Sequence, residues 1–397
     1  MLQLGGRTLR LQGADEKIQR IFRLSDDAEL PFALRPHRAY LARKPTKALP
    51  DGFAAYIALP PALDDLIVPQ DAIVVHLPDA YSYLASDDIV RINFAEQTIK
   101  VLFRAKSPNN FLLVTEQCNS YCLMCSQPPK AIEDSWILDE LREVITLIPP
   151  DSHELGFTGG EPFLFGERFL DILNLAKNML PRTAIHILSN GRLFCDKNFA
   201  ESYARICHPD MMVGIPLYSD DATIHDYIVQ ARGAFDETIR GILNLKELRQ
   251  RVEIRVVLHK QTVPRLQRLA EFICRNLLFV DQVALMGLEI TGFTRANLEQ
   301  LWIDPKDYSA ELTEAVRTFT AYRVPISIYN HQLCTVDRAV WPYCRKSISD
   351  WKNEYLEICG GCDVKPECGG FFSSSKQYRH SDYIAPISIV PVSSATN

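Results

Sequence analysis

Between residues 111 and 290, short apolar runs alternate with amphipathic segments, and this alternation constrains the fold of the chain more than any other feature. We expect strands at 111–117, 154–159, 184–190, 211–219, 253–260 and 282–290, and helices at 136–148, 167–180, 196–206, 236–249 and 264–277. Strands that are each followed by a helix predict parallel βα units with right-handed crossovers. Because six units fall short of the eight in a complete barrel, the sequence predicts an α/β fold built on a partial (β/α)6 TIM barrel.

Two regions of different character flank this alternation. Residues 1–110 contain strand-like runs and a hairpin that turns near Glu96–Gln97, so we expect a small β-rich N-terminal domain. Residues 111–325 form the predicted barrel. Residues 326–397 lose regular periodicity and contain a segment rich in Cys and Gly, and the last dozen residues are predicted to be a loose tail.

Composition and charge exclude several classes of function. The chain has 397 residues and a formal charge of -6, with 43 basic and 49 acidic residues intermixed, so it lacks the basic stripe that nucleic acid selects. No window approaches eighteen uninterrupted apolar residues, and the N-terminus has no apolar signal region. We therefore expect a cytoplasmic protein with neither a nucleic-acid nor a membrane partner.

Eight of the eleven cysteines fall into two clusters, which in a large cytosolic protein indicates metal or cluster ligation. Cys118, Cys122 and Cys125 follow the first predicted strand, at the end of the barrel where active sites are built. Their spacing lets one loop place three thiolates on three irons of a 4Fe-4S cluster, and the open fourth iron could chelate S-adenosylmethionine (SAM). A zinc site or a chance group of buried thiols is the alternative.

This CxxxCxxC spacing resembles the signature of the radical SAM superfamily. Gly159-Gly160-Glu161-Pro162, at the end of the second predicted strand, resembles the GGEP motif of that family. The resemblance implies that the motif contacts the methionine amino group, which fits a Gly-rich strand end where backbone and ligand come close.

Later strand ends match the family more loosely. The resemblance implies that SAM is contacted by further residues, and these are Met124, Ser189, Asn190, Ser219, Arg255 and Gly287. Met124 stands where the family usually has an aromatic residue near adenine. Ser189, Asn190 and Ser219 are also ordinary loop residues. Arg255, inside an apolar strand, needs a partner, which could be a substrate carboxylate or an internal acid.

The second cysteine cluster has the spacing CxxCx5C. Cys359, Cys362 and Cys368 could form a structural zinc knuckle with Cys334 or Cys344. The spacing also resembles the SPASM or twitch segment of peptide-modifying radical SAM enzymes, which implies one auxiliary 4Fe-4S cluster. We prefer Cys334 as its fourth ligand, because Cys334 follows a predicted strand end, and keep Cys344 as the alternative.

Other Cys and His residues receive structural interpretations. Cys195, Cys207 and Cys274 lie on or near predicted helices and are expected to be small core side chains. His225-Asp226 resembles a pair common in the peptide-modifying branch, but we expect a local cap and turn before the helix near residue 236.

Several segments resemble one group, the HxsC radical SAM maturases of His-Xaa-Ser peptide systems. They are VTEQCNSYCLMCSQPPK, LGFTGGEPFLFG, IHILSNGRLF, and SISDWKNEY followed by CxxCx5CGGFF. The resemblance implies a ribosomally made precursor peptide as substrate, a sister maturase HxsB, and a low-potential electron donor such as flavodoxin or ferredoxin. Hydrogen abstraction from such a peptide can lead to a cross-link, an epimer or a thioether. A small-molecule radical SAM enzyme and a non-catalytic zinc scaffold are the alternatives.

Overall fold

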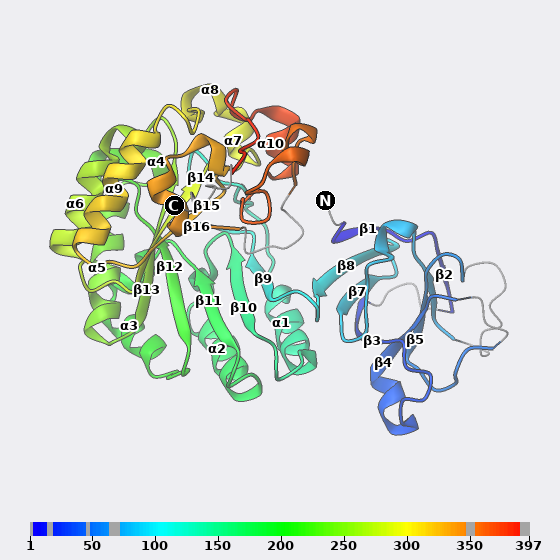
Figure 1. Ribbon diagram of the computed structural model, residues 1–397. Helices are drawn as coiled ribbons and strands as arrows, with labels where there is room; N and C mark the ends of the chain where they lie inside the picture. Colours follow the sequence, from blue (N-terminus) through cyan, green and yellow to red (C-terminus); the bar gives the residue numbers. More distant parts are fainter. Residues whose placement is uncertain (1–2, 14–18, 45–47, 63–71, 347–353, 390–397) are drawn as a thin grey trace, which may run out of the picture.

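The computed structural model of the chain describes residues 3–13, 19–44, 48–62, 72–346 and 354–389. The described strands form two eight-stranded sheets, one within residues 5–103 and one within residues 109–345 (Figure 1). The segment SISDWKNEY of the sequence comparison falls mostly outside the described residues, because 347–353 are not among them.

The first sheet is mixed and strongly curled. Its strand order is β1-β8-β7-β3-β4-β5-β6-β2. The strands are β1 (Gly5–Arg7), β2 (Arg10–Gln12), β3 (Gln19–Ser25), β4 (Arg38–Ala42), β5 (Ala55–Ala58), β6 (Val74–His76), β7 (Ile89–Asn93) and β8 (Thr98–Phe103). Only two residues separate β1 from β2, although these strands lie at opposite ends of the sheet, so the sheet curls until its two ends meet at this crossover. The predicted hairpin is β7–β8, and its turn contains Gln97 at φ 51°.

The second sheet is parallel throughout, in the order in which its strands occur in the chain. Its strands are β9 (Asn109–Thr115), β10 (Glu154–Gly159), β11 (Ala184–Leu188), β12 (Met211–Pro216), β13 (Arg251–Leu258), β14 (Gln282–Gly287), β15 (Ile326–Tyr329) and β16 (Cys344–Arg345). All six predicted strands are present, and their parallel order with intervening helices confirms the predicted α/β fold built on a partial TIM barrel. The short β15 and β16 extend the sheet beyond the six predicted βα units.

Helices cover one face of this parallel sheet (Figure 1). They are α1 (Trp136–Leu147), α2 (Glu167–Met179), α3 (Lys197–Ala204), α5 (Ala234–Glu247), α6 (Leu266–Asn276) and α9 (Ser309–Ala321). Their apolar stripes pack on alternate strand residues such as Leu155, Ile187 and Ile254, and together they form the largest apolar core. Each such fully buried side chain contributes about 1.5–3 kcal/mol of burial free energy, so this core holds the strand ends in fixed positions.

Short helices and turns occupy the loops. The helices are α4 (Ala222–Val229), α7 (Phe293–Ala296), α8 (Leu298–Leu301) and α10 (Ser373–Tyr378). The 3-10 turns are η1 (Phe32–His37), η2 (Asp79–Tyr81), η3 (Pro162–Phe165), η4 (Arg192–Cys195), η5 (Val263–Arg265), η6 (Leu333–Thr335), η7 (Arg338–Tyr343) and η9 (Glu357–Gly361). Of the helices in the described part of the chain, none is long and apolar enough to cross a membrane.

The two sheets are joined through α1. Arg91 on β7 pairs with Glu140 at 2.6 Å and lies 5.3 Å from the ring of Trp136. The Arg23 guanidinium donates to the Leu147 carbonyl at 3.1 Å. Ile89 and Phe103 of the first sheet also belong to the barrel core. The N-terminal sheet therefore packs on the first helix of the barrel.

The end of the described chain is not the loose tail that the sequence predicts. The Ile387 amide donates to the Cys362 sulfur at 3.4 Å, and the Asp363 amide donates to the Ile387 carbonyl at 2.9 Å. Ser381 Oγ donates to Asp304 at 2.7 Å. The prediction failed because the contacts are made to residues far away in the sequence; the rest of the tail, 390–397, lies outside the described residues.

Candidate functional site

The first cysteine cluster lies in a loop that leaves the carboxyl end of β9. Cys118, Cys122 and Cys125 are all half-buried free thiols. Burial raises the pKa of Cys118 to about 11 and that of Cys122 to about 12, and the neighbouring thiols raise both pKa values further. The Cys125 thiol donates to the Gln127 carbonyl at 3.0 Å. The structure thus brings the three predicted ligands together on one loop.

Two neighbouring segments fix the backbone of this loop. On one side, the amides of Tyr121 and Leu123 donate to carbonyls at the end of α4. On the other side, α7 and α8 bind the loop carbonyls. These bonds are Asn297 Nδ2 to Leu123 O at 2.8 Å, Thr294 Oγ1 to Met124 O at 3.1 Å, and Phe293 N to Cys125 O at 2.8 Å. The loop conformation is therefore set by elements up to 174 residues away in the chain.

The Gly159–Pro162 turn packs directly against the start of the cysteine loop. The Gly160 amide donates to Thr115 O and the Glu161 amide donates to Gln117 O, both at 2.8 Å. A Cβ on Gly160 would lie 1.9 Å from Gln117 O and 3.1 Å from Cys118 Cβ. Gly159 has φ +145°, and a Cβ on it would lie 2.2 Å from Thr115 O. Glycine is required here because the two backbones touch.

Glu161 connects this turn to the end of β11. Its buried carboxylate accepts from Phe163 N at 3.0 Å, Ser189 Oγ at 2.9 Å and Asn190 N at 2.6 Å. Burial raises the pKa of Glu161 to about 7, while these donors and Arg192 oppose the rise. The structure therefore brings together three residues that the sequence predicted separately.

Arg192, at the start of η4, is a site residue that the sequence reasoning missed. Its guanidinium donates to Asn119 O at 2.7 Å and to Ser120 Oγ at 3.2 Å, both inside the cysteine loop. Its Nε donates to Glu237 at 2.6 Å. Asn190 Nδ2 also reaches the loop, at 2.6 Å from Asn119 Oδ1. The only sequence signal was its position directly after the predicted Asn190-Gly191 strand end.

Asp134 is a second missed residue. Its buried carboxylate accepts from Thr115 Oγ1 at 3.0 Å, from Glu116 N at 2.6 Å and from Gln117 Nε2 at 3.0 Å. These three donors are the residues directly before Cys118, so Asp134 fixes the exit of β9 into the loop. An isolated Asp sixteen residues after Cys118 carries no sequence signal for this role.

The remaining predicted SAM contacts lie at or near strand ends. Met124 packs in an apolar cluster with Tyr218, Ile228 and Leu301. Ser219 is fully buried, and its hydroxyl accepts from Asp221 N at 3.1 Å.

Gly287 lies against the Asn330 carbonyl, where a Cβ would stand 2.4 Å away. Its contact with SAM, like those of Met124 and Ser219, stays a prediction.

Arg255 has an internal acid as its partner. Its Nη1 donates to Glu253 at 2.6 Å and its Nη2 lies 3.1 Å from the Met286 sulfur. His186 Nε2 stands 3.6 Å from Glu253 and has no hydrogen-bond partner among the described residues. Burial lowers the pKa of His186 to about 4. The sequence allowed a substrate carboxylate or an internal acid as the partner of Arg255, and the structure shows the internal acid Glu253.

The structural interpretation of His225-Asp226 is confirmed. Asp226 accepts from the amides of Gly233 and Phe235 at 2.5 and 2.8 Å and so caps α5. His225 is buried, and its Nδ1 accepts from Tyr218 N at 3.2 Å. The pair therefore shapes the connection between α4 and α5.

Residues 112–273 match the family model described as the Radical SAM superfamily. This region is a radical SAM domain. It begins within β9, ends within α6, and contains the cysteine loop, the GGEP turn and Arg192. A radical SAM domain implies a 4Fe-4S cluster and SAM as its cofactors.

Comparison with known proteins gives weak whole-chain similarity. No curated protein matches the sequence. Streptococcus suis SuiB bound to SAM is 18% identical, with a TM-score of 0.45 over 64% of this chain and 56% of that chain. SuiB bound to the precursor peptide SuiA is 17% identical, with a TM-score of 0.43 over 60% and 51%. Native anSMEcpe with bound AdoMet is 17% identical, with a TM-score of 0.44 over 56% and 64%. The matches span less than two thirds of each of these solved chains.

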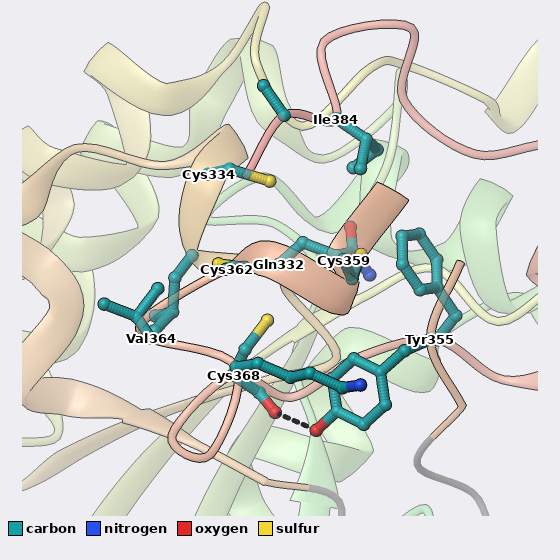
Figure 2. Close-up of a pocket in the computed structure, with 12 residues that line it drawn as sticks. Gln332, Cys334, Tyr355, Cys359, Cys362, Val364, Cys368 and Ile384 are labelled. Carbon is teal, nitrogen blue, oxygen red and sulfur yellow. Dashed lines mark hydrogen bonds between the residues drawn. The ribbon is translucent and has the colours of Figure 1, made fainter. Parts of the chain in front are cut away.

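Beyond the radical SAM domain, four cysteines line one small pocket with a cavity volume of about 20 Å³. Figure 2 shows Cys334, Cys359, Cys362 and Cys368 around this pocket, together with Tyr355. The Tyr355 hydroxyl donates to the Cys368 carbonyl at 2.8 Å. Cys334 comes from η6, more than twenty residues before the other three, and the tertiary structure brings it to them.

Cys344 does not line this pocket. Its thiol lies 3.6 Å from the Val340 carbonyl, and the residue packs against the apolar cluster of Leu333, Val364 and Cys368. Burial raises the pKa of Cys344 to about 12. Among the described residues, no group of three or more His, Cys, Asp or Glu side chains stands at the spacing of a single metal ion.

The isolated cysteines differ from one another. Cys274 is buried in the barrel core, as predicted. Cys195 is half-buried at the end of η4. Cys207 is exposed, with φ 52°, in the turn after α3, so its assignment as a core side chain was wrong. The sequence could not show that α3 ends three residues earlier.

Proposed function

We propose that this protein is a radical SAM peptide maturase. It would cleave SAM reductively to a 5'-deoxyadenosyl radical and abstract hydrogen from a ribosomally made precursor peptide of the His-Xaa-Ser repeat type. The observation that carries this proposal is the contact between the three-thiol loop and the Gly159–Pro162 turn inside a radical SAM domain.

The cysteine loop has the properties that a cluster site needs. Hydrogen bonds to α4 on one side and to α7 and α8 on the other hold its backbone, and its three thiols are half-buried. Burial raises the pKa values of all three thiols, and repulsion by neighbouring thiols raises those of Cys118 and Cys122 further, so iron must displace their protons when it binds. Cys118, Cys122 and Cys125 would hold three irons of a 4Fe-4S cluster, which when bound supplies the electron that cleaves SAM.

Residues around the loop would orient SAM. Glu161 ties the ends of β10 and β11 together, so its carboxylate fixes the turn that would receive the methionine amino group. The proposed SAM-binding residues are Met124, Gly159, Gly160, Glu161, Pro162, Ser189, Asn190, Ser219, Arg255 and Gly287.

The pocket in Figure 2 supports an auxiliary 4Fe-4S cluster held by Cys334, Cys359, Cys362 and Cys368. Four thiolates leave no open iron, and a fully ligated cluster suits one-electron transfer. It would accept the electron that the substrate radical gives up, while the substrate proton passes to a base. Cys334 is favoured over Cys344 because only Cys334 lines the pocket.

The substrate and partners rest on the sequence resemblance to HxsC maturases. We propose a His-Xaa-Ser precursor peptide as substrate, HxsB as a sister maturase, flavodoxin or ferredoxin as electron donor, and the cytoplasm as location. The proposed domain boundaries are 1–110, 111–325 and 326–397.

The test is anaerobic reconstitution followed by assay with a synthetic His-Xaa-Ser repeat peptide, SAM and dithionite. We expect about eight iron and eight sulfide per chain, corresponding to two 4Fe-4S clusters. Cys118→Ala should abolish 5'-deoxyadenosine formation. Cys362→Ala should still cleave SAM but should not modify the peptide. The peptide should therefore keep its mass and its chromatographic retention time.

Each component of the proposal has its own refuting result. Zinc in place of iron would make the protein a zinc scaffold. SAM cleavage without any change in the peptide would point to a small-molecule substrate. Normal peptide modification by Cys362→Ala would eliminate the auxiliary cluster from the reaction.

A further inference from the structure

Arg192 makes three polar contacts that connect the barrel to the cysteine loop. Two of its hydrogen bonds go to the loop, to Asn119 O at 2.7 Å and Ser120 Oγ at 3.2 Å. The third goes to Glu237 in the first turn of α5, at 2.6 Å. The two loop acceptors are the residues that directly follow Cys118, so the guanidinium stands beside the proposed iron ligands.

The burial of the two partners is unequal. The Arg192 side chain is 14% exposed, whereas that of Glu237 is 42% exposed. Solvent screens the carboxylate more than the guanidinium, because an exposed charge interacts through a higher effective dielectric. The ion pair therefore leaves a net positive field on the inner side, toward the loop.

We propose that Arg192 is a positioning residue whose charge, balanced by Glu237, sets the reduction potential of the radical-generating cluster. The inference rests on the proposed function, since it requires the cluster at Cys118, Cys122 and Cys125. Reduction adds one electron to the cluster, and a nearby cation stabilises the more negative, reduced form. Glu237 reduces this stabilisation.

The proposal predicts opposite effects for the two partners of the pair. Arg192→Gln removes the cation and should lower the ratio of reduced to oxidised cluster at a fixed applied potential by about tenfold, a shift of about 59 mV for one electron. Glu237→Gln removes the counter-charge and should raise this ratio. Arg192→Lys keeps the positive charge but cannot bond to the loop and to Glu237 at once as the planar guanidinium does. Its ratio of reduced to oxidised cluster should therefore lie closer to that of wild type than the ratio of Arg192→Gln does.

The experiment is a potentiometric titration monitored by electron paramagnetic resonance on the reconstituted full chain without SAM. The radical-cluster signal is identified as the one that Cys118→Ala lacks. Arg205→Gln is the matched control, because the Arg205 side chain is exposed to solvent and pairs with Glu201 on α3, not with the cysteine loop. Its ratio should equal that of wild type.

The outcomes separate this inference from the function on which it rests. A wild-type protein without the Cys118-dependent signal would overturn the proposed function. A wild-type signal with shifts of the same sign in Arg192→Gln and Glu237→Gln, or with no shift in either, would overturn only the role of the ion pair. If Arg192→Gln fails to hold a cluster, Glu237→Gln and Arg192→Lys still decide the sign of the effect.

Discussion

Replacing Gly160 with alanine tests whether contact between the GGEP turn and the cysteine loop holds the first cluster site. The new Cβ would stand 1.9 Å from Gln117 O and 2.5 Å from its carbonyl carbon. Both are backbone atoms, so no side-chain rotation relieves the overlap. The loop must retreat by about 1.5 Å to reach ordinary van der Waals contact.

The cost of this retreat can be worked out from the contacts. Two hydrogen bonds of 2.8 Å, from Gly160 N and Glu161 N, are lost or weakened at about 1 kcal/mol each. Overpacking adds about 1–3 kcal/mol. The free energy of unfolding should therefore fall by about 3–5 kcal/mol. The displacement also far exceeds the tolerance of metal–ligand distances, about 0.2 Å.

Two measurements check the Gly160→Ala prediction. The melting temperature of the cluster-free protein should fall by roughly 4–6 °C, and iron after reconstitution should drop by about four per chain. Gly5→Ala is the control, because its Cβ meets only Ile99 O at an ordinary 3.5 Å. If Gly160→Ala keeps the iron content and melting temperature of Gly5→Ala, the contact does not organise the loop and the reasoning is wrong.

The fourth auxiliary ligand and the acid stability of the fold can be tested in the same protein. Cys334→Ala should lose about four iron per chain, whereas Cys344→Ala should keep them, because only Cys334 lines the pocket; iron analysis showing the reverse would make Cys344 the ligand. Burial lowers the pKa of His225 to about 4 and that of His259 to about 3. The unfolded state therefore binds more protons than the folded state below about pH 6.5, and stability should fall by about 1.4 kcal/mol per pH unit for each histidine as the pH drops from 6 to 4. Denaturant unfolding of wild type and His259→Gln at pH 6 and pH 5 measures this slope, and equal slopes in the two proteins would contradict the role of His259.

The sequence could predict the motifs of the cluster site but not the hydrogen bonds that connect them. The spacing of Cys118, Cys122 and Cys125 and the GGEP segment are local sequence patterns, and the predicted strands put them at one end of the sheet. Asp134 and Arg192 were not predicted, because their roles depend on contacts to residues that belong to no sequence motif. The choice of Cys334 over Cys344 likewise follows from a pocket, which spacing alone does not define.

The sequence by itself determined the alternation of strands and helices, because hydrophobic periodicity and chain connectivity are local properties that dictate a parallel βα barrel. It also determined which thiols share a loop. Only the tertiary structure decided what surrounds those thiols. Gly160 must be glycine because two backbones from different strands touch, the tail to residue 389 is ordered because it binds Cys362 and Asp363, and Arg192 lies beside the loop because β11 neighbours β10.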